Sequence, residues 1–208
     1  MNKRLKPVFR MIGKKAARDI IEEALGILAK IGVFVENDEA LLLLKEAGMN
    51  IEENRVFITE NLISNCLKSA PSAIKIYDRS GDLKMNLKHD NTYFVPGSAA
   101  VYFLDSEGAV RKPRTADYIN LMRLTDFLPN LTAQSTAMIP ADVPLQIVDL
   151  YRLYLSLLHS RKPVVTGTFD KKNFEPMKKM LMAVRGSEQE LRRKPLAIFD
   201  ACPSSPLQ

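Results

Sequence analysis

Residues 131–169 read LTAQSTAMIPADVPLQIVDLYRLYLSLLHSRKPVVTGTF, and the fold prediction depends on this stretch. Its first eight residues, 131–138, are strand-like, and Pro140 stops the strand because proline has no N–H for a sheet ladder. Residues 143–160 then carry apolar side chains at helical spacing, and KPVVTGTF (162–169) is again strand-like. A strand, a helix and a second strand in this order predict parallel strands joined by a crossover helix.

The same alternation continues on both sides of this stretch. A helix capped by Thr115 is predicted before it, and helical segments over 175–194 lead to a strand at 195–201 after it. The order of helix, strand, helix, strand, helix and strand predicts a parallel sheet, but three strands cannot close a barrel. We therefore expect residues 115–208 to form the first part of a (β/α) barrel in a truncated chain.

Residues 19–71 are predicted to be a helical region with short extended links. Side chains that cap helices and glycines or prolines that end them delimit three helices. These helices are expected over 19–31 before Gly32, over 39–47 after Asn37 or Asp38, and over 60–70 between Thr59 and Pro71.

Residues 72–114 differ in composition from both neighbouring regions. The short segments AIKIY, LKMNL, TYFV and AVYFLD are rich in β-branched or aromatic residues, and Asp105–Gly108 is a good hairpin turn before AVRKP. This region is predicted to be a small antiparallel insertion or cap.

The charge distribution argues against nucleic acid as the partner of the folded body. The 208-residue chain has a net charge of +6, but residues 1–18 hold seven of its 30 basic side chains and no acid, which leaves 23 basic against 24 acidic. The excess therefore belongs to a basic N-terminal arm, which is either solvated or contacts phosphate or an acidic partner. No apolar run is long enough to span a membrane, and two cysteines suggest a reducing cytoplasm.

The order of several segments resembles a known family. These segments are ALGILAKIGVFVENDEALLLLKEAGMNIEENRVFIT, RKPRTADYINLMRLTDFLPNL, IPADVP, RKPVVTGTF and a final strand leading into SSPL. Together, over roughly residues 19–207, they resemble the N-terminal portion of the trimethylamine methyltransferase family. That family includes relatives without pyrrolysine that act on quaternary amines such as glycine betaine.

The resemblance implies an α/β fold: a partial TIM (β/α)8 barrel with an N-terminal helical layer and a small antiparallel β insertion. It also implies transfer of a methyl group from a tertiary or quaternary amine to the cobalt of a separate corrinoid protein, so that the corrinoid (cobalamin) cofactor is carried by a partner. The family chain is longer than this one, and the pyrrolysine position and any catalytic groups on later strands lie outside this sequence.

Asp142 is the first candidate for substrate binding. The active site of a TIM barrel lies at the C-terminal ends of the strands, and Asp142 stands between Pro140 and Pro144 directly after a predicted strand. Its carboxylate is either opposite a methylammonium cation or a cap of the following helix. Both roles are compatible.

The other candidates follow the next two predicted strands. Thr166, Thr168 and Phe169 lie at the end of VVTGTF, and Ser204 follows the strand at 195–201. Packing or capping roles are the alternative for each of them, and Cys202 is expected to be an inert thiol. No metal site is predicted, since His89 and His159 have no ligand-spaced partner. The sequence identifies no catalytic residue.

Two other functions are compatible with the sequence. One is a different TIM-barrel enzyme, because a fold does not fix a function. The other is a non-catalytic half-barrel that serves only in assembly or binding. Because an incomplete barrel exposes strand edges, we also expect the isolated chain to form homo-oligomers or to aggregate.

Overall fold

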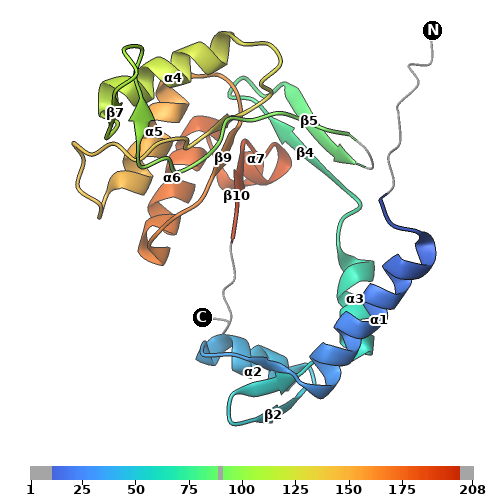
Figure 1. Cartoon of the computed structure of the whole chain (residues 1–208). Helices are drawn as coiled ribbons and strands as arrows, with labels where there is room; N and C mark the ends of the chain where they lie inside the picture. The colour runs from blue at the N-terminus through green and yellow to red at the C-terminus, as the bar shows by residue number, and fades with distance from the viewer. Residues whose placement is uncertain (1–10, 89–90, 202–208) are drawn as a thin grey trace, which may run out of the picture. The chain divides into compact units, whose positions relative to one another are not determined.

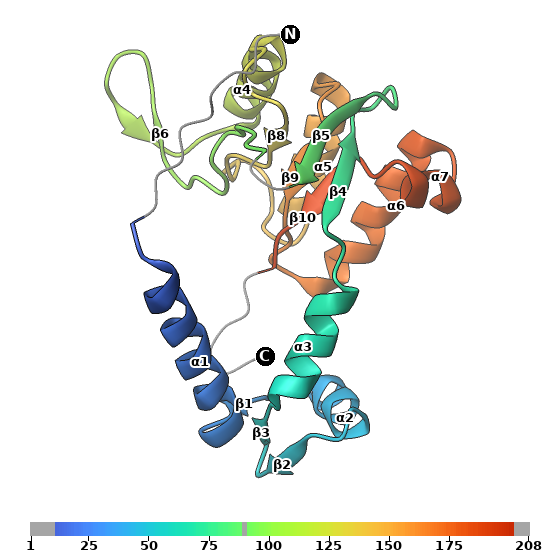
Figure 2. The same ribbon diagram turned by 90° about the vertical axis from the view of Figure 1, so that its right-hand side faces the viewer.

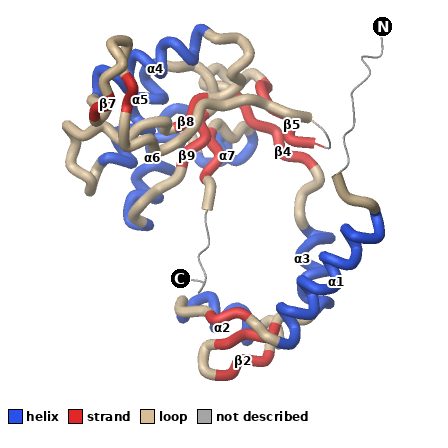
Figure 3. The backbone as a smooth tube through the Cα atoms, viewed as in Figure 1, coloured by secondary structure: helices blue, strands red, loops and turns tan. Residues whose placement is uncertain are grey.

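The computed structural model describes residues 11–88 and 91–201, and within them the chain is a mixed α/β protein (Figures 1 and 3). The chain divides into two compact units, whose described parts are residues 11–70 and 71–201. None of the helices described within these ranges is long and apolar enough to cross a membrane.

The first unit combines three helices with a small antiparallel sheet. Its helices are α1 (Lys14–Lys30), α2 (Asp38–Glu46) and α3 (Glu60–Ser69), and its strands are β1 (Val33–Phe34), β2 (Asn50–Glu52) and β3 (Arg55–Phe57). The strands pair in the order β1-β3-β2. The prediction of a helical layer was therefore incomplete. It omitted β2, which turns into β3 through Glu53 and Asn54, both with positive φ, the backbone conformation of a two-residue hairpin turn.

The predicted caps of these helices are confirmed. Asn37 Oδ1 accepts a 2.9 Å hydrogen bond from the Ala40 N–H, and Thr59 Oγ1 accepts a 3.4 Å bond from the Leu62 N–H. Gly32 follows α1 with φ of 75°. The start of α1 was predicted too late, because the segment KKAAR (14–18) contains good helix formers and already belongs to the helix.

The second unit begins with two antiparallel hairpins. They are formed by β4 (Ala73–Tyr77) with β5 (Leu83–Lys88) and by β6 (Phe103–Leu104) with β7 (Val110–Arg111). The predicted turn at Asp105–Gly108 is confirmed, since the Gly108 N–H donates to Asp105 O at 3.1 Å. The segment TYFV (92–95) was predicted as a strand of this antiparallel region, but it makes only one isolated bridge, which is parallel.

A parallel sheet with crossover helices forms the rest of the second unit. Its strands are β8 (Gln134–Ser135), β9 (Val164–Thr166) and β10 (Ala197–Phe199), and the helices are α4 (Thr115–Phe127), α5 (Val148–His159), α6 (Phe174–Arg185) and α7 (Glu188–Arg193), with a 3-10 turn η1 (Lys171–Asn173). Both strand pairs, β8 with β9 and β9 with β10, are parallel. The predicted direction of the strands is therefore confirmed.

The helices cover one face of this sheet. Leu153 and Leu157 of α5 pack with Met177 and Leu181 of α6 around Val164 of β9, and all five side chains are buried. Since successive residues of a strand point to opposite faces, Val165 and Ile198 lie on the other face, which we call the helix-free face.

The hairpin β4–β5 covers part of the helix-free face. Ile76 and Met85 pack with Ala133, and Val165 and Ile198 lie against this cluster. Figure 2 shows the hairpin beside β9 and β10. The predicted antiparallel hairpin is thus not a separate insertion, because it packs into the core of the second unit and covers this face of the sheet.

Hydrogen bonds to its backbone fix the hairpin at the end of the sheet where β9 and β10 begin. The Tyr77 N–H donates to Pro195 O, just before β10, at 2.8 Å. Arg185 of α6 donates to the carbonyl oxygens of Tyr77, Asp78 and Arg79 at 2.7–3.3 Å. These contacts do not reach the part of the helix-free face at the C-terminal ends of β8, β9 and β10.

A fourth chain segment runs parallel to β8 on the edge away from β9. Isolated parallel bridges join Phe94 to Leu131 and Ala100 to Met138. The Thr132 N–H donates to Phe94 O and the Ala100 N–H to Ala137 O, each at 2.8 Å. Pro96 and Gly97 lie between the two bridges, and proline lacks the N–H that a continuous ladder needs. Residues 94–100 therefore form an irregular edge segment of the parallel sheet, whereas the sequence analysis placed the strands predicted at its two ends in an antiparallel region.

The first turn of α4 is held by Asp117. Thr115 was predicted as the cap of α4, but it is the first helical residue and Arg114 is the N-cap. The Asp117 carboxylate accepts the Arg114 N–H at 2.8 Å and both terminal nitrogens of Arg111 at 2.7 and 2.8 Å. The hydrogen bonds from Arg111 are the main reason why the pKa of Asp117 falls from its ordinary 3.8 to about 2.

This pKa shift predicts a loss of stability in acid. A carboxylate whose pKa is lower in the folded state than in the unfolded state stabilises the fold above its unfolded pKa. That contribution is expected to disappear as the pH falls from 3.8 to about 2. The variant Asp117→Asn should lose stability at pH 7 and show a flatter stability profile between these pH values in chemical denaturation. A profile with the same slope as that of the unmodified chain would contradict this assignment.

Candidate functional site

The C-terminal ends of the parallel strands bring polar side chains together. The ladder between β9 and β10 continues past the strand ends, because the Asp200 N–H donates to Thr166 O at 2.9 Å. Five residues on the helix-covered side define what we call the strand-end cluster: Thr136, Asp149, Arg152, Thr168 and Phe169. Asp200 and Gly167 lie on the helix-free face.

Asp149 of α5 anchors the loop after β9. Its side chain is 1% exposed, and its Oδ2 atom accepts hydrogen bonds from Thr168 Oγ1 at 3.0 Å, from the Phe169 N–H at 2.8 Å and from Asn173 Nδ2 at 3.3 Å. Three donors on one carboxylate oxygen fix the path of the loop that carries Thr168 and Phe169.

Arg152 is the buried counter-ion of Asp149. Its Nη1 atom lies 3.5 Å from Asp149 Oδ1, its Nη2 atom donates to the carbonyl oxygen of Thr136 at the end of β8, and its side chain is 3% exposed. Among the described residues, neither Asp149 Oδ1 nor Arg152 Nε has a hydrogen-bond partner. Burial lowers the pKa of Arg152 below its ordinary value. The pair therefore ties α5 to the ends of β8 and β9.

Two of the sequence candidates, Thr166 at the end of β9 and Phe169 in the loop after it, differ in how accessible their side chains are. Thr166 is buried, and its hydroxyl lies 3.2 Å from the hydroxyl of Thr136. The Phe169 ring is 63% exposed, and the Arg152 guanidinium carbon lies 5.3 Å from its centre. The hydroxyl of Thr166 thus bonds within the protein, whereas one face of Phe169 remains accessible.

Asp200 and Gly167 form a neighbouring pair on the helix-free face. In the register of the parallel ladder Phe199 pairs with Thr166, so Asp200 and Gly167 follow as the next pair. A Cβ atom on Gly167 would lie 2.8 Å from Asp200 Oδ1. The Asp200 side chain is exposed, which makes its carboxylate accessible at the end of the sheet where α/β proteins bind ligands.

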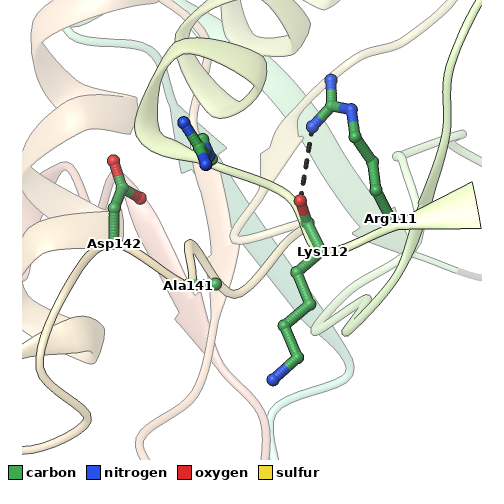
Figure 4. A pocket seen from close by; sticks show the side chains of 5 residues that line it. Arg111, Lys112, Ala141 and Asp142 are labelled. Atoms are coloured by element: carbon green, nitrogen blue, oxygen red, sulfur yellow. Dashed lines mark hydrogen bonds between the residues drawn. The ribbon is translucent and has the colours of Figure 1, made fainter.

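Asp142 lies in a different place, beside the start of α4. Its Oδ1 atom accepts the Thr115 N–H at 2.9 Å, so it caps α4 and not the helix that follows it. It lines a pocket of about 470 Å³ with Arg111, Lys112 and Ala141, and Figure 4 shows its carboxylate across the pocket from Arg111. Arg114 also lines this pocket.

The remaining sequence candidates lie outside the described residues. Ser204, Cys202 and His89 belong to the ranges 202–208 and 89–90. Thr166, Thr168 and Phe169 are therefore the predicted site residues that the structure brings together. Within residues 11–88 and 91–201, no group of three His, Cys, Asp or Glu side chains is arranged to hold a metal ion.

The sequence analysis missed Asp149, Arg152 and Asp200. A signal for the first two existed, because Asp149, Arg152 and Ser156 recur at spacings of three and four in a helix whose other buried positions are apolar. Such a polar stripe on the buried side of a helix indicates partners inside the protein. Asp200 gave no comparable signal, since a single acid after a strand is common.

A profile of the family described as "Trimethylamine methyltransferase (MTTB)" matches residues 2–208. The chain belongs to the trimethylamine methyltransferase family. The family inferred from the ordered segments is therefore confirmed.

Individual relatives within the trimethylamine methyltransferase family are distant. The chain is 26% identical over 195 residues to "Glycine betaine methyltransferase" of Desulfitobacterium hafniense (strain Y51), an alignment that covers 93% of this chain and 41% of the relative. It is 27% identical over 187 residues to "Trimethylamine methyltransferase MttB" of D. hafniense (strain DSM 10664 / DCB-2), covering 88% and 38%. It is 29% identical over 131 residues to "L-carnitine:corrinoid methyltransferase" of Eubacterium limosum, covering 63% and 26%.

The chain thus spans about two fifths of the length of the first two of these relatives, 41% and 38%. Their names include both a tertiary and a quaternary amine as substrate. The names of these two relatives therefore do not single out one class of amine.

Proposed function

We propose that this chain is part of a methyltransferase that moves a methyl group from a tertiary or quaternary amine to a corrinoid protein. The observation that carries the proposal is the family match over residues 2–208. The parallel sheet supports it, because the ends of its strands present an exposed acid and an exposed aromatic ring on neighbouring loops.

We further propose that the second unit supplies the first four strands of a (β/α)8 barrel. In this arrangement the successive barrel strands are residues 94–100, β8, β9 and β10. The helices between them are α4, α5 and α6. The order is consecutive and all pairs are parallel, which is the winding of a barrel. The helix-free face becomes the barrel interior, and the hairpin β4–β5 closes its lower end.

The corrinoid, carried by the partner protein, supplies the cobalt nucleophile that accepts the methyl group. The residues of this chain have the task of holding the amine so that one methyl carbon faces the open end of the sheet. A quaternary ammonium has no N–H to donate, so its recognition depends on charge and on aromatic faces.

The substrate contacts predicted from the sequence remain proposals. Asp142, Thr168 and Phe169 lie in the loops after β8 and β9, where a barrel binds its substrate. Thr166 is also proposed as a substrate contact at the end of β9, although its hydroxyl lies 3.2 Å from that of Thr136 and its carbonyl oxygen accepts the Asp200 N–H. Ser204, which follows β10 in the sequence, is likewise proposed to bind the substrate.

A methyl-transfer assay tests the proposed function. The purified chain is mixed with a reduced corrinoid protein and, in separate reactions, with trimethylamine, glycine betaine, carnitine and proline betaine. Methylation of cobalt changes the visible absorption spectrum, and at least one amine is expected to produce this change. Binding of the corrinoid protein without transfer from any amine would instead support the non-catalytic assembly module. If the chain neither binds the corrinoid protein nor transfers a methyl group from any of the four amines, the proposal is overturned.

A further inference from the structure

Asp200 and Gly167 are cross-strand neighbours at the open end of the helix-free face. Val165 and Ile198 of this face pack against the hairpin, and Gly167 and Asp200 come two residues later in the same two strands. The ladder bond from the Asp200 N–H to Thr166 O holds the backbone of Asp200 in place. The position of the carboxylate therefore follows from the sheet and not from a free loop.

Gly167 makes room for this carboxylate. Its φ lies outside the left-handed region, so the backbone does not require glycine at this position. Any larger residue would place a Cβ atom 2.8 Å from Asp200 Oδ1 and 3.5 Å from Asp200 Cγ. A contact of 2.8 Å cannot persist, so a side chain at position 167 would displace the carboxylate.

The charge of Asp200 is available for a ligand. Its side chain is exposed, and across the described ranges no Lys, Arg or His nitrogen lies within 4.0 Å of its carboxylate. Arg152 is engaged on the helix-covered side by Asp149 and by the carbonyl oxygen of Thr136. Arg152 interacts with Asp200 only through charge at longer range and forms no ion pair with it, so the Asp200 carboxylate remains open to a cation from solution.

Phe169 is a weaker candidate for the same task. An aromatic face attracts cations, but the Arg152 guanidinium already lies 5.3 Å from the centre of this ring. A second cation on the opposite face of the ring would be repelled by the first one.

We propose that Asp200 is the anionic group that holds the ammonium centre of the methylated amine, with Gly167 providing the space beside it. This inference rests on the proposed function for the identity of the cation. It assigns the ligand class, a tertiary or quaternary ammonium ion, to a carboxylate that directly follows β10 on the helix-free face. The contact is a charge interaction, because a tetra-alkylated nitrogen offers no hydrogen bond.

Titration with tetramethylammonium tests this site without requiring methyl transfer. Binding to the 208-residue chain is followed by NMR, using the backbone amide signals of Gly167 and Asp200. Asp200→Asn is expected to weaken binding by about tenfold, the effect of removing one charge a few ångströms from the cation in a partly solvated site. Gly167→Ala retains the charge but displaces it, and it should also weaken binding severalfold.

The matched control is Asp82→Asn, which removes the same charge at the other end of the sheet. Asp82 is exposed in the turn between β4 and β5, and Lys194, just before β10, donates to the neighbouring Gly81 O at 2.9 Å. This variant should bind tetramethylammonium like the unmodified chain. Amide spectra of all variants show whether the fold is retained.

The outcomes separate this inference from the proposed function. No tetramethylammonium binding by the unmodified chain, or equal binding by Asp200→Asn in a folded state, overturns the inference. If methyl transfer from an amine persists undiminished in Asp200→Asn, the function stands and the inference fails. If tetramethylammonium binding depends on Asp200 but no amine donates a methyl group, the site stands and the methyltransferase function fails.

Discussion

The variant Asp149→Ala is expected to lower the free energy of unfolding of the second unit by about 3–5 kcal/mol, the range for breaking one side of a buried ion pair. The substitution removes the acceptor of three hydrogen bonds, which are donated by Thr168, Phe169 and Asn173. It also removes the counter-ion of Arg152, and because the side chains of Asp149 and Arg152 are only 1% and 3% exposed, water cannot replace it. Chemical denaturation followed by circular dichroism measures the loss.

The variant Arg152→Met should cost less than Asp149→Ala. Without Arg152, the carboxylate of Asp149 retains its three hydrogen-bond donors. Without Asp149, the Arg152 guanidinium loses its buried counter-ion and retains the carbonyl oxygen of Thr136 and the ring of Phe169 as close partners. The double variant should cost less than the sum of the two single variants, because neither charge is left buried alone. Asp82→Asn is the control and should change stability little. Additive costs, or a larger cost for Arg152→Met, would show that the two side chains do not act as a pair.

The variant Leu153→Ala is expected to lower the free energy of unfolding of the same unit by about 2–5 kcal/mol, the range for truncating a buried leucine. Leu153 is fully buried between β9 and α6 in the cluster around Val164. The cavity would lie where α5 and α6 contact each other and the sheet, and these elements are too tightly connected to close it.

Leu158→Ala on the same helix provides the comparison. Leu158 is 53% exposed, so its truncation removes the same atoms without opening a buried cavity. The two variants share composition and helix propensity, and the difference between their unfolding midpoints isolates the effect of burial. If the two midpoints fell equally, the assignment of the core to the α5–α6 side of the sheet would be wrong.

Local signals in the sequence were sufficient for most helices and for the direction of the parallel strands. Asn37 and Thr59 act through hydrogen bonds to backbone groups three residues later, and their predicted roles as helix caps are confirmed. Strand direction followed from the alternation of strands and helices, because a crossover helix returns the chain to the same end of the sheet.

The rest depended on contacts between residues far apart in the sequence. Residues 94–100 contain Pro96 and Gly97, so their pairing with β8 had no local signal. The hairpin β4–β5 has the alternation of an isolated antiparallel element, and only its contact with Val165 and Ile198 makes it part of the core. The candidate site was only partly predicted for the same reason. Thr168 and Phe169 directly follow a predicted strand and were identified, whereas Asp149 belongs to a helix and contacts them from 19 and 20 residues away in the sequence.

The packing of the β4–β5 hairpin also sets the order in which the second unit can mature. Ile76 and Met85 are covered by side chains up to Ile198, and the carbonyl oxygen of Asp78 receives its hydrogen bond from a residue 107 positions later. During synthesis from the N-terminus, the hairpin leaves the ribosome before the residues that cover Ile76 and Met85 have been translated, so these apolar side chains are exposed to solvent. They stay exposed while the intervening chain is translated. Chaperones that bind exposed apolar strands are therefore expected to bind this hairpin in the nascent chain.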